Sequence, residues 1–296
     1  MHRAHLKTLF ANGLSPRSSV LGPPARAPEI FQSSTSSRMS HLQPEEARPR
    51  RESELCNHWS KLPRYDCEGI WREFEEAVVR RTPCSVRVKD YQRMFRATPQ
   101  TLPCDKLLFW SKTHDLVHSY SAVTRRFWTL EDTLVGYMFN DLIWCGKEEK
   151  DRGFNFSACP EWSDCVNHPV YSLWKQASQN FAEAACGNIT VILNGSIKDA
   201  FNRKSMFGGV ELDSLNPRMV NHVNIKVVTN LEGPLIESCT EGSIVDLIKI
   251  LQTRGFRWTC TDYDLTLMIL QCMKNPKQYS CLTCADSLLN RKKPVL

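Results

Sequence analysis

The chain has 296 residues, 13 cysteines and a formal net charge of +6. This length suffices for one large domain or two modest ones, each with a hydrophobic core of its own. Eight Lys/Arg against five Asp/Glu give residues 1–55 a charge of +3 and leave +3 for the other 241 residues. Because no basic stripe stands out, no nucleic acid partner is expected.

The cysteines lie between Cys56 and Cys284 and are spread through the chain instead of being grouped with metal-ligand spacing. So many cysteines indicate disulfides and an oxidising compartment. The C-x-x-C motif from Cys281 to Cys284 has no second pair and no histidine cluster near it, so a zinc site is the weaker interpretation. Because the number of cysteines is odd, at least one thiol is left over.

Three N-glycosylation sequons agree with secretion: Asn155 in NFS, Asn188 in NIT and Asn194 in NGS. No signal peptide or membrane anchor is visible, because no apolar run approaches the ~18 residues of a spanning helix. Residues 1–28 hold four basic residues and no acid, which also fits a mitochondrial transit peptide. The cysteines and sequons favour instead a protein that is secreted or on the extracellular face of the plasma membrane. An alternative first exon or an incomplete gene model would explain the missing signal.

Composition and periodicity divide the chain. Residues 1–50 carry six of the sixteen prolines and many serines, which predicts disorder. Folding is expected to begin near Cys56, and the segment 67–81 has apolar residues at helical spacing. Further helices are predicted over 114–127, 130–138 and 170–185.

The later third of the chain has a different pattern. Runs rich in β-branched residues and closed by turn residues occupy 189–195 and 224–230, and segments 107–111 and 256–260 have the same character. An amphipathic helix over 244–255 ends in a glycine. Four short strands separated by helices predict a small parallel sheet. We therefore expect a mixed α+β or α/β fold with two lobes, a helical lobe and a smaller lobe built on a four-stranded parallel sheet.

The segment 129–145, TLEDTLVGYMFNDLIWC, sets carboxylates and amides among aromatic residues and ends in a cysteine. It closely resembles the signature segment of the ADP-ribosyl cyclase / cyclic ADP-ribose hydrolase family, whose members cleave the nicotinamide–ribose bond of NAD and act in calcium signalling. The resemblance covers about residues 55–284. It implies a chain that crosses between the lobes more than once, with 51–103 plus 129–185 in the helical lobe and 104–128 plus 186–296 in the α/β lobe.

Spacing alone cannot choose among the disulfide connectivities that so many cysteines allow. The resemblance implies six pairs, namely Cys56–Cys67, Cys84–Cys165, Cys104–Cys186, Cys145–Cys159, Cys239–Cys260 and Cys272–Cys281. Cys284 is then the spare thiol, although Cys281 and Cys284 could exchange roles.

The reaction of the family asks for a carboxylate. Nicotinamide leaves as a neutral molecule and the positive charge passes to the ribose, where a fixed carboxylate can stabilise it. Glu211 in SMFGGVEL matches the catalytic glutamate of the family, and Gly208 and Gly209 suit a close backbone approach. Without the resemblance, Glu211 would be interpreted as a solvent-facing residue of a strand.

Two tryptophans are candidates for stacking on the substrate. Trp110 in LFWSK and Trp174 in SLWKQAS match the indoles that flank the substrate in the family, and flat aromatic faces suit a planar cation. For an arbitrary tryptophan, core packing is the commoner role. By the same resemblance, Ser111 and Ser178 reach phosphate or ribose oxygens.

Glu131 lies in the first turn of the predicted helix 130–138, where a carboxylate by itself favours the positive end of the helix dipole. By resemblance, Glu131 acts at the catalytic centre, holds the nicotinamide carboxamide and influences the split between cyclisation and hydrolysis. Asp132 beside it joins the predicted substrate-binding residues. Asn140 lies nine residues after Glu131, so a continuous helix would point the two side chains in opposite directions. Both can line one cleft only if the helix breaks, and Gly136 is the expected break.

Three positions depart from the pattern common in vertebrate members. Asn140 replaces the first of two aspartates, and Lys112 stands where an arginine is common, which leaves a point charge without bidentate phosphate binding. Met206 replaces a small hydroxyl residue, and with Phe207 it joins the predicted substrate-binding residues. An apolar group at Met206 could exclude water from the ribosyl centre. We therefore expect a larger share of cyclic product than in a typical vertebrate homologue, although Glu131 argues the other way.

The resemblance implies an ectoenzyme whose substrates are NAD and NADP, with no further cofactor and no metal. With NADP and nicotinic acid at acidic pH, exchange of the base is also expected. A homodimer and an association with membranes are both compatible with the resemblance. Two rivals stay open. One is a receptor or adhesion module that has lost the chemistry on the same scaffold, and the other is a glycohydrolase that makes no cyclic product.

Overall fold

The computed structural model describes residues 65–79, 81–140, 142–147, 153–156, 159–161, 164–231 and 233–282. The segment 1–50, which was predicted to be disordered, lies outside these residues. In chain order the elements are α2 (Cys67–Val78), the 3-10 helix η3 (Val88–Tyr91), α3 (Gln92–Ala97), β1 (Leu108–Ser111), α4 (His114–Thr124), the 3-10 helix η4 (Leu130–Asp132), α5 (Leu134–Phe139), β2 (Cys145–Gly146), β3 (Phe154–Asn155), α6 (Pro169–Glu183), β4 (Gly187–Asn194), the π-helix η6 (Phe207–Glu211), α7 (Leu212–Ser214), β5 (Val220–Val228), α8 (Ser243–Thr253), β6 (Trp258–Thr261) and α9 (Leu265–Lys274).

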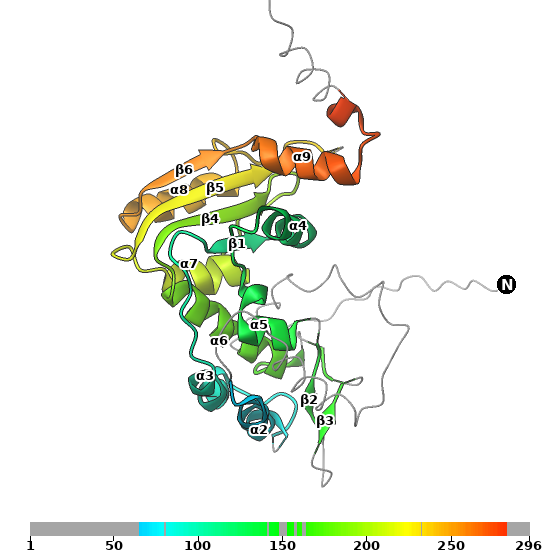
Figure 1. Ribbon diagram of the computed structural model, residues 1–296, viewed down its shortest axis with the longest axis vertical. Helices are drawn as coiled ribbons and strands as arrows, with labels where there is room; N and C mark the ends of the chain where they lie inside the picture. The colour runs from blue at the N-terminus through cyan, green and yellow to red at the C-terminus, as the bar shows by residue number, and fades with distance from the viewer. Residues whose placement is uncertain are drawn as a thin grey trace, which may run out of the picture.

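The four predicted strands form one parallel sheet in the order β1, β4, β5, β6, as the sequence indicated (Figure 1). The strand β4 pairs with β1 and β5, so that Val191 lies opposite Phe109 on one side and Ile225 on the other. All residues from Ile189 to Leu193 are buried. A run of β-branched residues without polar alternation is typical of a strand that is covered on both faces.

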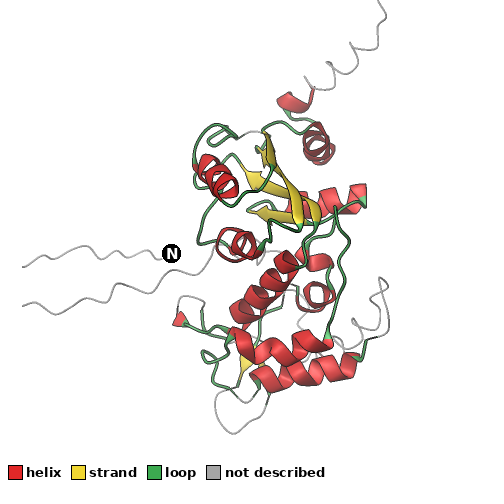
Figure 2. Cartoon of the chain, turned by 90° about the vertical axis from the view of Figure 1, so that its left-hand side faces the viewer, coloured by secondary structure: helices red, strands yellow, loops and turns green. Residues whose placement is uncertain are grey.

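Helices cover both faces of this sheet (Figures 1 and 2). On one face α4 and α9 pack through Val117 and Leu267 against a patch that includes Ile192. On the other face the end of α6 and the helix α8 bury Phe181 and Leu247 against the sheet. The sheet part of the molecule is therefore a three-layer α/β/α arrangement.

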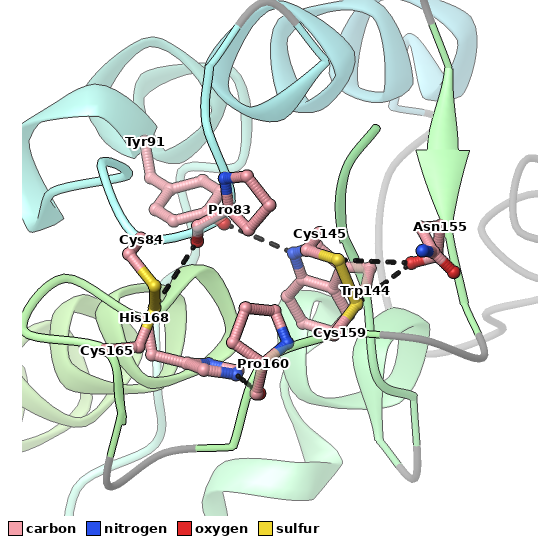
Figure 3. Close-up of a disulfide and its surroundings, with 10 residues drawn as sticks. All are labelled: Pro83, Cys84, Tyr91, Trp144, Cys145, Asn155, Cys159, Pro160, Cys165 and His168. Carbon is pink, nitrogen blue, oxygen red and sulfur yellow. Dashed lines mark hydrogen bonds between the residues drawn. A yellow bond between two sulfur atoms is a disulfide. The ribbon is translucent and has the colours of Figure 1, made fainter. Parts of the chain in front are cut away.

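A second core forms around α2, α3, α5 and the first half of α6, at the lower end of Figure 1. The ring centroid of Phe74 lies 4.5 Å from that of Phe139 and 5.4 Å from that of Trp144. The Tyr91 hydroxyl donates to the carbonyl of Pro169 at 3.0 Å. It accepts from the Trp144 indole at 3.2 Å (Figure 3). The polar atoms that these rings carry into the core are thus satisfied.

The helix α6 connects the two cores. Its residues Trp174 and Ala177 belong to the second core, whereas Phe181 and Ala182 belong to the sheet core. A buried side chain of α6 that lies in the sequence between Ala177 and Phe181 therefore faces the junction of the two cores. The boundaries of the two lobes, as the resemblance implied them, stay a prediction.

Five disulfides are present in the described part of the chain, and all five pairs were predicted: Cys84–Cys165, Cys104–Cys186, Cys145–Cys159, Cys239–Cys260 and Cys272–Cys281. Figure 3 shows two of these disulfides, Cys84–Cys165 and Cys145–Cys159, beside Tyr91 and Trp144 of the second core. Cys67 is also disulfide-bonded, but Cys56 lies outside the described residues, so that pair stays a prediction. This set of disulfides indicates an oxidising compartment.

The sequence left open whether Cys281 or Cys284 pairs with Cys272, and in the structure Cys272 is bonded to Cys281. Cys284 itself lies outside the described residues. The predicted helix 114–127 ends earlier, at Thr124, because Arg125 adopts the left-handed backbone conformation with φ of 50°. Within the described ranges, no helix is long and apolar enough to span a bilayer.

Candidate active site

Four of the predicted site residues lie on elements that contact one another. The helix α6 contacts both η6 and η4, and β1 contacts η6. These elements carry Ser178, Glu211, Glu131 and Trp110 respectively. Sequence segments that are far apart thus bring the predicted catalytic residues into one region.

Glu211 is the last residue of η6, and η6 is a π-helix, a rare geometry that is frequent at functional sites. Two glycines allow this π-helix to pack directly against the backbone of the preceding loop. A Cβ atom on Gly208 would lie 2.1 Å from the carbonyl oxygen of Asn202, and one on Gly209 would lie 2.6 Å from that of Arg203. The alternative interpretation of Glu211 as a solvent-facing strand residue is therefore wrong, since the residue is helical and 7% exposed.

Two arginines, which the sequence analysis did not single out, hold this segment in place. Arg203 donates to the carbonyl of Gly208 at 2.5 Å and forms a two-bond ion pair with Asp213 at 2.9 and 2.7 Å. Arg254 donates to the carbonyls of Leu212 and, at 2.7 Å, of Leu215. Fixed carbonyls on both sides of Glu211 leave its backbone little freedom.

The carboxylate of Glu211 accepts a hydrogen bond from the Ser178 hydroxyl at 2.8 Å. Burial raises the pKa of Glu211 to about 8, because a charged carboxylate loses its hydration there. The bond from Ser178 opposes this shift, and the nearby negative charge of Glu131 adds to it. A buried carboxyl group whose pKa lies near neutrality is a common mark of an active site.

Glu131 lies in η4, and its Oε2 atom is buried without a hydrogen-bond partner in the structure. A buried acceptor in this state costs free energy, on the order of 1–3 kcal/mol. The atom can be satisfied by a ligand that brings an N–H or O–H group. This property matches the predicted role of Glu131 toward a carboxamide, which stays a prediction.

The predicted helix 130–138 does break, but the expected position of the break was wrong. The chain leaves helical geometry at Thr133, with ψ of 161°, and restarts as α5 with the Thr133 hydroxyl accepting from the Gly136 N–H at 3.0 Å. Gly136 is needed for packing instead, because its Cβ would lie 2.1 Å from the carbonyl oxygen of Leu130. Asn140 forms the C-terminal cap of α5.

Asp132 has a structural task that the sequence analysis did not foresee. Its Oδ2 atom accepts from the Thr129 backbone N–H at 2.9 Å and from the Thr129 hydroxyl at 3.2 Å, and the Ser121 hydroxyl lies 3.5 Å away. These bonds close the turn that holds Glu131. A role of Asp132 in substrate binding stays a prediction.

The two predicted indoles lie in different settings. Trp174 is 5% exposed and precedes Ser178 by one turn on the same face of α6. Trp110 is half-buried at the end of β1, and its ring lies steeply inclined to the imidazoles of His114 and His118, at interplanar angles of 68° and 69° and centroid distances of 5.3 and 6.4 Å. The two histidines were not predicted as site residues. They follow the LFWSK motif and lie four residues apart, which was a usable signal.

The substrate-binding role of the predicted residues Ser111, Lys112, Met206 and Phe207 stays a prediction, and the structure gives their surroundings. The hydroxyl of Ser111 is buried and has no hydrogen-bond partner in the structure. Lys112 adopts a left-handed backbone conformation with φ of 58°, and its carbonyl accepts from the Asn194 side chain at 3.4 Å. Met206 and Phe207 are both buried, and they pack in the second core and in the sheet core respectively.

The three sequons differ in accessibility. Asn188 is exposed on β4. The Asn194 side chain is engaged, because it donates to Lys112 and accepts from the Ser196 N–H at 3.0 Å. Asn155 is half-buried in β3, where its carbonyl oxygen lies 3.8 and 3.1 Å from the sulfur atoms of the Cys145–Cys159 disulfide (Figure 3). Glycosylation of all three asparagines stays a prediction.

A buried carboxyl group with a raised pKa that is coupled to a second carboxylate is typical of the active site of an enzyme. A sequence model of the ADP-ribosyl cyclase family matches residues 49–281. The chain belongs to this family.

Relatives agree over most of the chain. The "ADP-ribosyl cyclase/cyclic ADP-ribose hydrolase 1" of mouse is 40% identical over 217 residues, which are 73% of this chain and 71% of the mouse protein. A structure of Aplysia cyclase with "substrate NGD and product cGDPR" superposes with a TM-score of 0.74 at 32% identity and covers 79% of this chain and 96% of that one. Porcine CD38 with a covalent intermediate superposes with a TM-score of 0.68 at 37% identity, covering 74% and 95%.

Proposed function

We propose that this protein cleaves the bond between nicotinamide and ribose in NAD and forms both cyclic ADP-ribose and ADP-ribose, a reaction that serves calcium signalling. The observation that carries the proposal is the environment of Glu211. Its carboxyl group is buried, bonded to Ser178 at 2.8 Å and influenced by the charge of Glu131. The name of the mouse relative contains both a cyclase and a hydrolase activity, which supports the formation of both products.

In the proposed reaction the carbon–nitrogen bond breaks and its electron pair leaves with nicotinamide. The ribose becomes an oxocarbenium-like cation, and the Glu211 carboxylate stabilises it. The substrate carries a positive pyridinium ring, which favours the ionised form of Glu211 and lowers the pKa that burial raises in the free enzyme. Attack by water gives ADP-ribose, and attack by the adenine of the same molecule gives the cyclic product.

Other residues would position the substrate. We assign the nicotinamide carboxamide to Glu131, whose buried Oε2 atom has no donor in the structure. The unsatisfied hydroxyl of Ser111 supports a bond to a phosphate or ribose oxygen. Trp110 and Trp174 are assigned to stacking, with Asn140 and Lys112 at the edge of the site. On NADP, the same intermediate would exchange nicotinamide for nicotinic acid.

The split between the two products is assigned in part to Met206. Its side chain is 8% exposed and lies five residues before Glu211. An apolar group at this position keeps water from the ribosyl centre and favours the cyclic product. The variant Met206→Thr is expected to raise the share of ADP-ribose, while Met219→Thr, a change at a methionine that is 52% exposed, serves as the control. An unchanged product ratio in Met206→Thr would remove the support for this assignment.

We also propose that the enzyme works on the extracellular face of the plasma membrane or as a secreted protein, since five disulfides support an oxidising compartment. Association into a homodimer is part of the same proposal.

The direct test is product analysis. The full chain, produced through a secretory pathway, is incubated with NAD, and nicotinamide, ADP-ribose and cyclic ADP-ribose are quantified. Release of nicotinamide with both nucleotide products supports the proposal. Nicotinamide and ADP-ribose without cyclic product would identify a glycohydrolase. A folded protein that releases no nicotinamide would favour the receptor or adhesion module.

A further inference from the structure

The outer face of α9 carries a row of exposed apolar side chains. Leu265, Ile269 and Met273 are 52%, 40% and 69% exposed. Their spacing of four residues places them along one face of the helix. The inner face carries Leu267 and Leu270, which are 0% and 5% exposed and pack toward α4 and the sheet. The helix α9 is therefore apolar on both faces, although the described residues cover only one of them.

Tyr263, two residues before the helix begins, is also exposed, at 64%. We call Tyr263, Leu265, Ile269 and Met273 the α9 surface. The segment that follows α9 is tied back to it by the Cys272–Cys281 disulfide and carries Tyr279, which is 80% exposed. Single exposed apolar residues are common on proteins, whereas a row of them on one element marks an interaction surface.

The α9 segment itself carries basic charges, and one exposed carboxylate, that of Asp115 on α4, lies near Lys274, whose ammonium group donates to the Asp115 carbonyl at 3.4 Å. From Leu265 to Leu282 the sequence contains Lys274 and Lys277 and no acidic residue. The two aspartates that precede the helix are engaged within the protein. Asp262 accepts from the Cys239 N–H at 2.7 Å, and Asp264 forms an ion pair with Lys226. A partner of the α9 surface is therefore expected to combine an apolar interior with negative charge at its boundary.

We propose that the α9 surface docks onto a membrane that presents anionic headgroups. An apolar face with tyrosine at its edge and lysines beside it has the pattern of a helix that lies in the plane of the interface. The ten residues of α9 span about 15 Å, so the helix would lie along the membrane and not cross it. Leu265, Ile269 and Met273 enter the boundary of the acyl chains, and Lys274 and Lys277 contact the headgroups.

The position of α9 permits this docking. The helix lies at the end of the molecule opposite α2 and the second core, on the outer side of the sheet (Figure 1). The elements η4, η6 and α6, which carry Glu131, Glu211 and Ser178, are not part of the α9 surface. The proposal is independent of the reaction that these residues catalyse.

The test is flotation of the purified full chain with two kinds of vesicle, pure phosphatidylcholine and phosphatidylcholine mixed with phosphatidylserine. The wild type is expected to float with the mixed vesicles. The double variant Ile269→Asn with Met273→Asn is expected to bind them about tenfold or more weakly. The variant Lys277→Gln, at an exposed lysine, is expected to bind the mixed vesicles about fivefold more weakly than the wild type. Its binding to pure phosphatidylcholine vesicles is expected to equal that of the wild type.

Val166→Asn is the matched control, because Val166 is 86% exposed and follows Cys165, which is bonded to Cys84 beside the second core. This variant is expected to float like the wild type, and unchanged circular dichroism and NAD turnover show that all variants are folded. Equal flotation of the wild type and the double variant, or no flotation of the wild type, overturns the proposal. A wild-type dimer in gel filtration that the double variant converts to a monomer, without flotation of either, would assign the surface to contact between two copies instead.

Discussion

Glu211 is expected to make the fold less stable as the pH rises, and the variant Glu211→Gln should remove this effect. The folded protein holds the pKa of this carboxyl group at about 8, above the ordinary value of 4.5 that applies to the unfolded chain. The group therefore contributes its full stability below pH 4.5, and this contribution is lost as the pH rises through 8. A glutamine is neutral at every pH and can still accept the bond from Ser178.

The difference between the two proteins follows from the two pKa values. The free energy of unfolding of the wild type is expected to fall relative to Glu211→Gln by about 4 kcal/mol between pH 5 and pH 9, at about 1.4 kcal/mol for each pH unit between the two pKa values. For a domain of this size such a difference corresponds to about 10 °C in Tm. Glu211, the residue assigned to the chemistry, is thus expected to lower the free energy of unfolding at alkaline pH. Active-site residues of other enzymes also reduce stability in this way.

Thermal unfolding followed by calorimetry at a series of pH values measures the difference directly. Glu211→Gln should be close to the wild type at pH 5 and clearly more stable at pH 9. Glu241→Gln, at an exposed glutamate, is the control and should change Tm little at any pH. If the difference in Tm between the wild type and Glu211→Gln stays constant or becomes smaller with rising pH, the burial of an ionisable Glu211 is not the cause of the pH dependence of stability.

Three further predictions concern the site and its surroundings. The variant Ser178→Ala loses a bond that favours ionised Glu211, so the rising limb of kcat/KM against pH should move to higher pH and turnover at neutral pH should fall about tenfold, with partial recovery in Ser178→Thr. Glu131→Gln removes a negative charge that raises the pKa of Glu211, so the same limb should move to lower pH; a limb that stays in place would contradict the coupling of the two carboxylates. Asn188 is the most accessible sequon, so Asn188→Gln should remove one glycan and increase mobility on a denaturing gel, and unchanged mobility would show that the sequon is unused.

Much of the sheet could be predicted from the sequence, because its signal is local. The run from Ile189 to Leu193 is rich in β-branched residues and closes with turn residues, a pattern that favours a buried strand in any context. The amphipathic pattern of α8 and its end at Gly255 were equally local, and the glycine has the positive φ of 79° that a helix end requires.

The geometry around Glu211 could not be predicted in the same way. Gly208 and Gly209 are poor helix formers, so SMFGGVEL gave no helical signal, and the reason for the glycines lies in the carbonyls of Asn202 and Arg203 against which they pack. The burial of Glu211 likewise depends on Ser178, a residue 33 positions away. The break at Thr133 was within reach, since threonine before an apolar helix is a common N-terminal cap.

The central claim is that the Glu211 carboxylate carries the cleavage of NAD, and its most direct test is nicotinamide release by the wild type and Glu211→Gln under the same conditions. Circular dichroism and thermal unfolding first establish that both proteins are folded. The account predicts rapid release by the wild type and a loss of at least about a hundredfold in kcat for the variant, the order expected when a group that stabilises charge in the transition state is removed. Turnover of Glu211→Gln at the wild-type rate would contradict it.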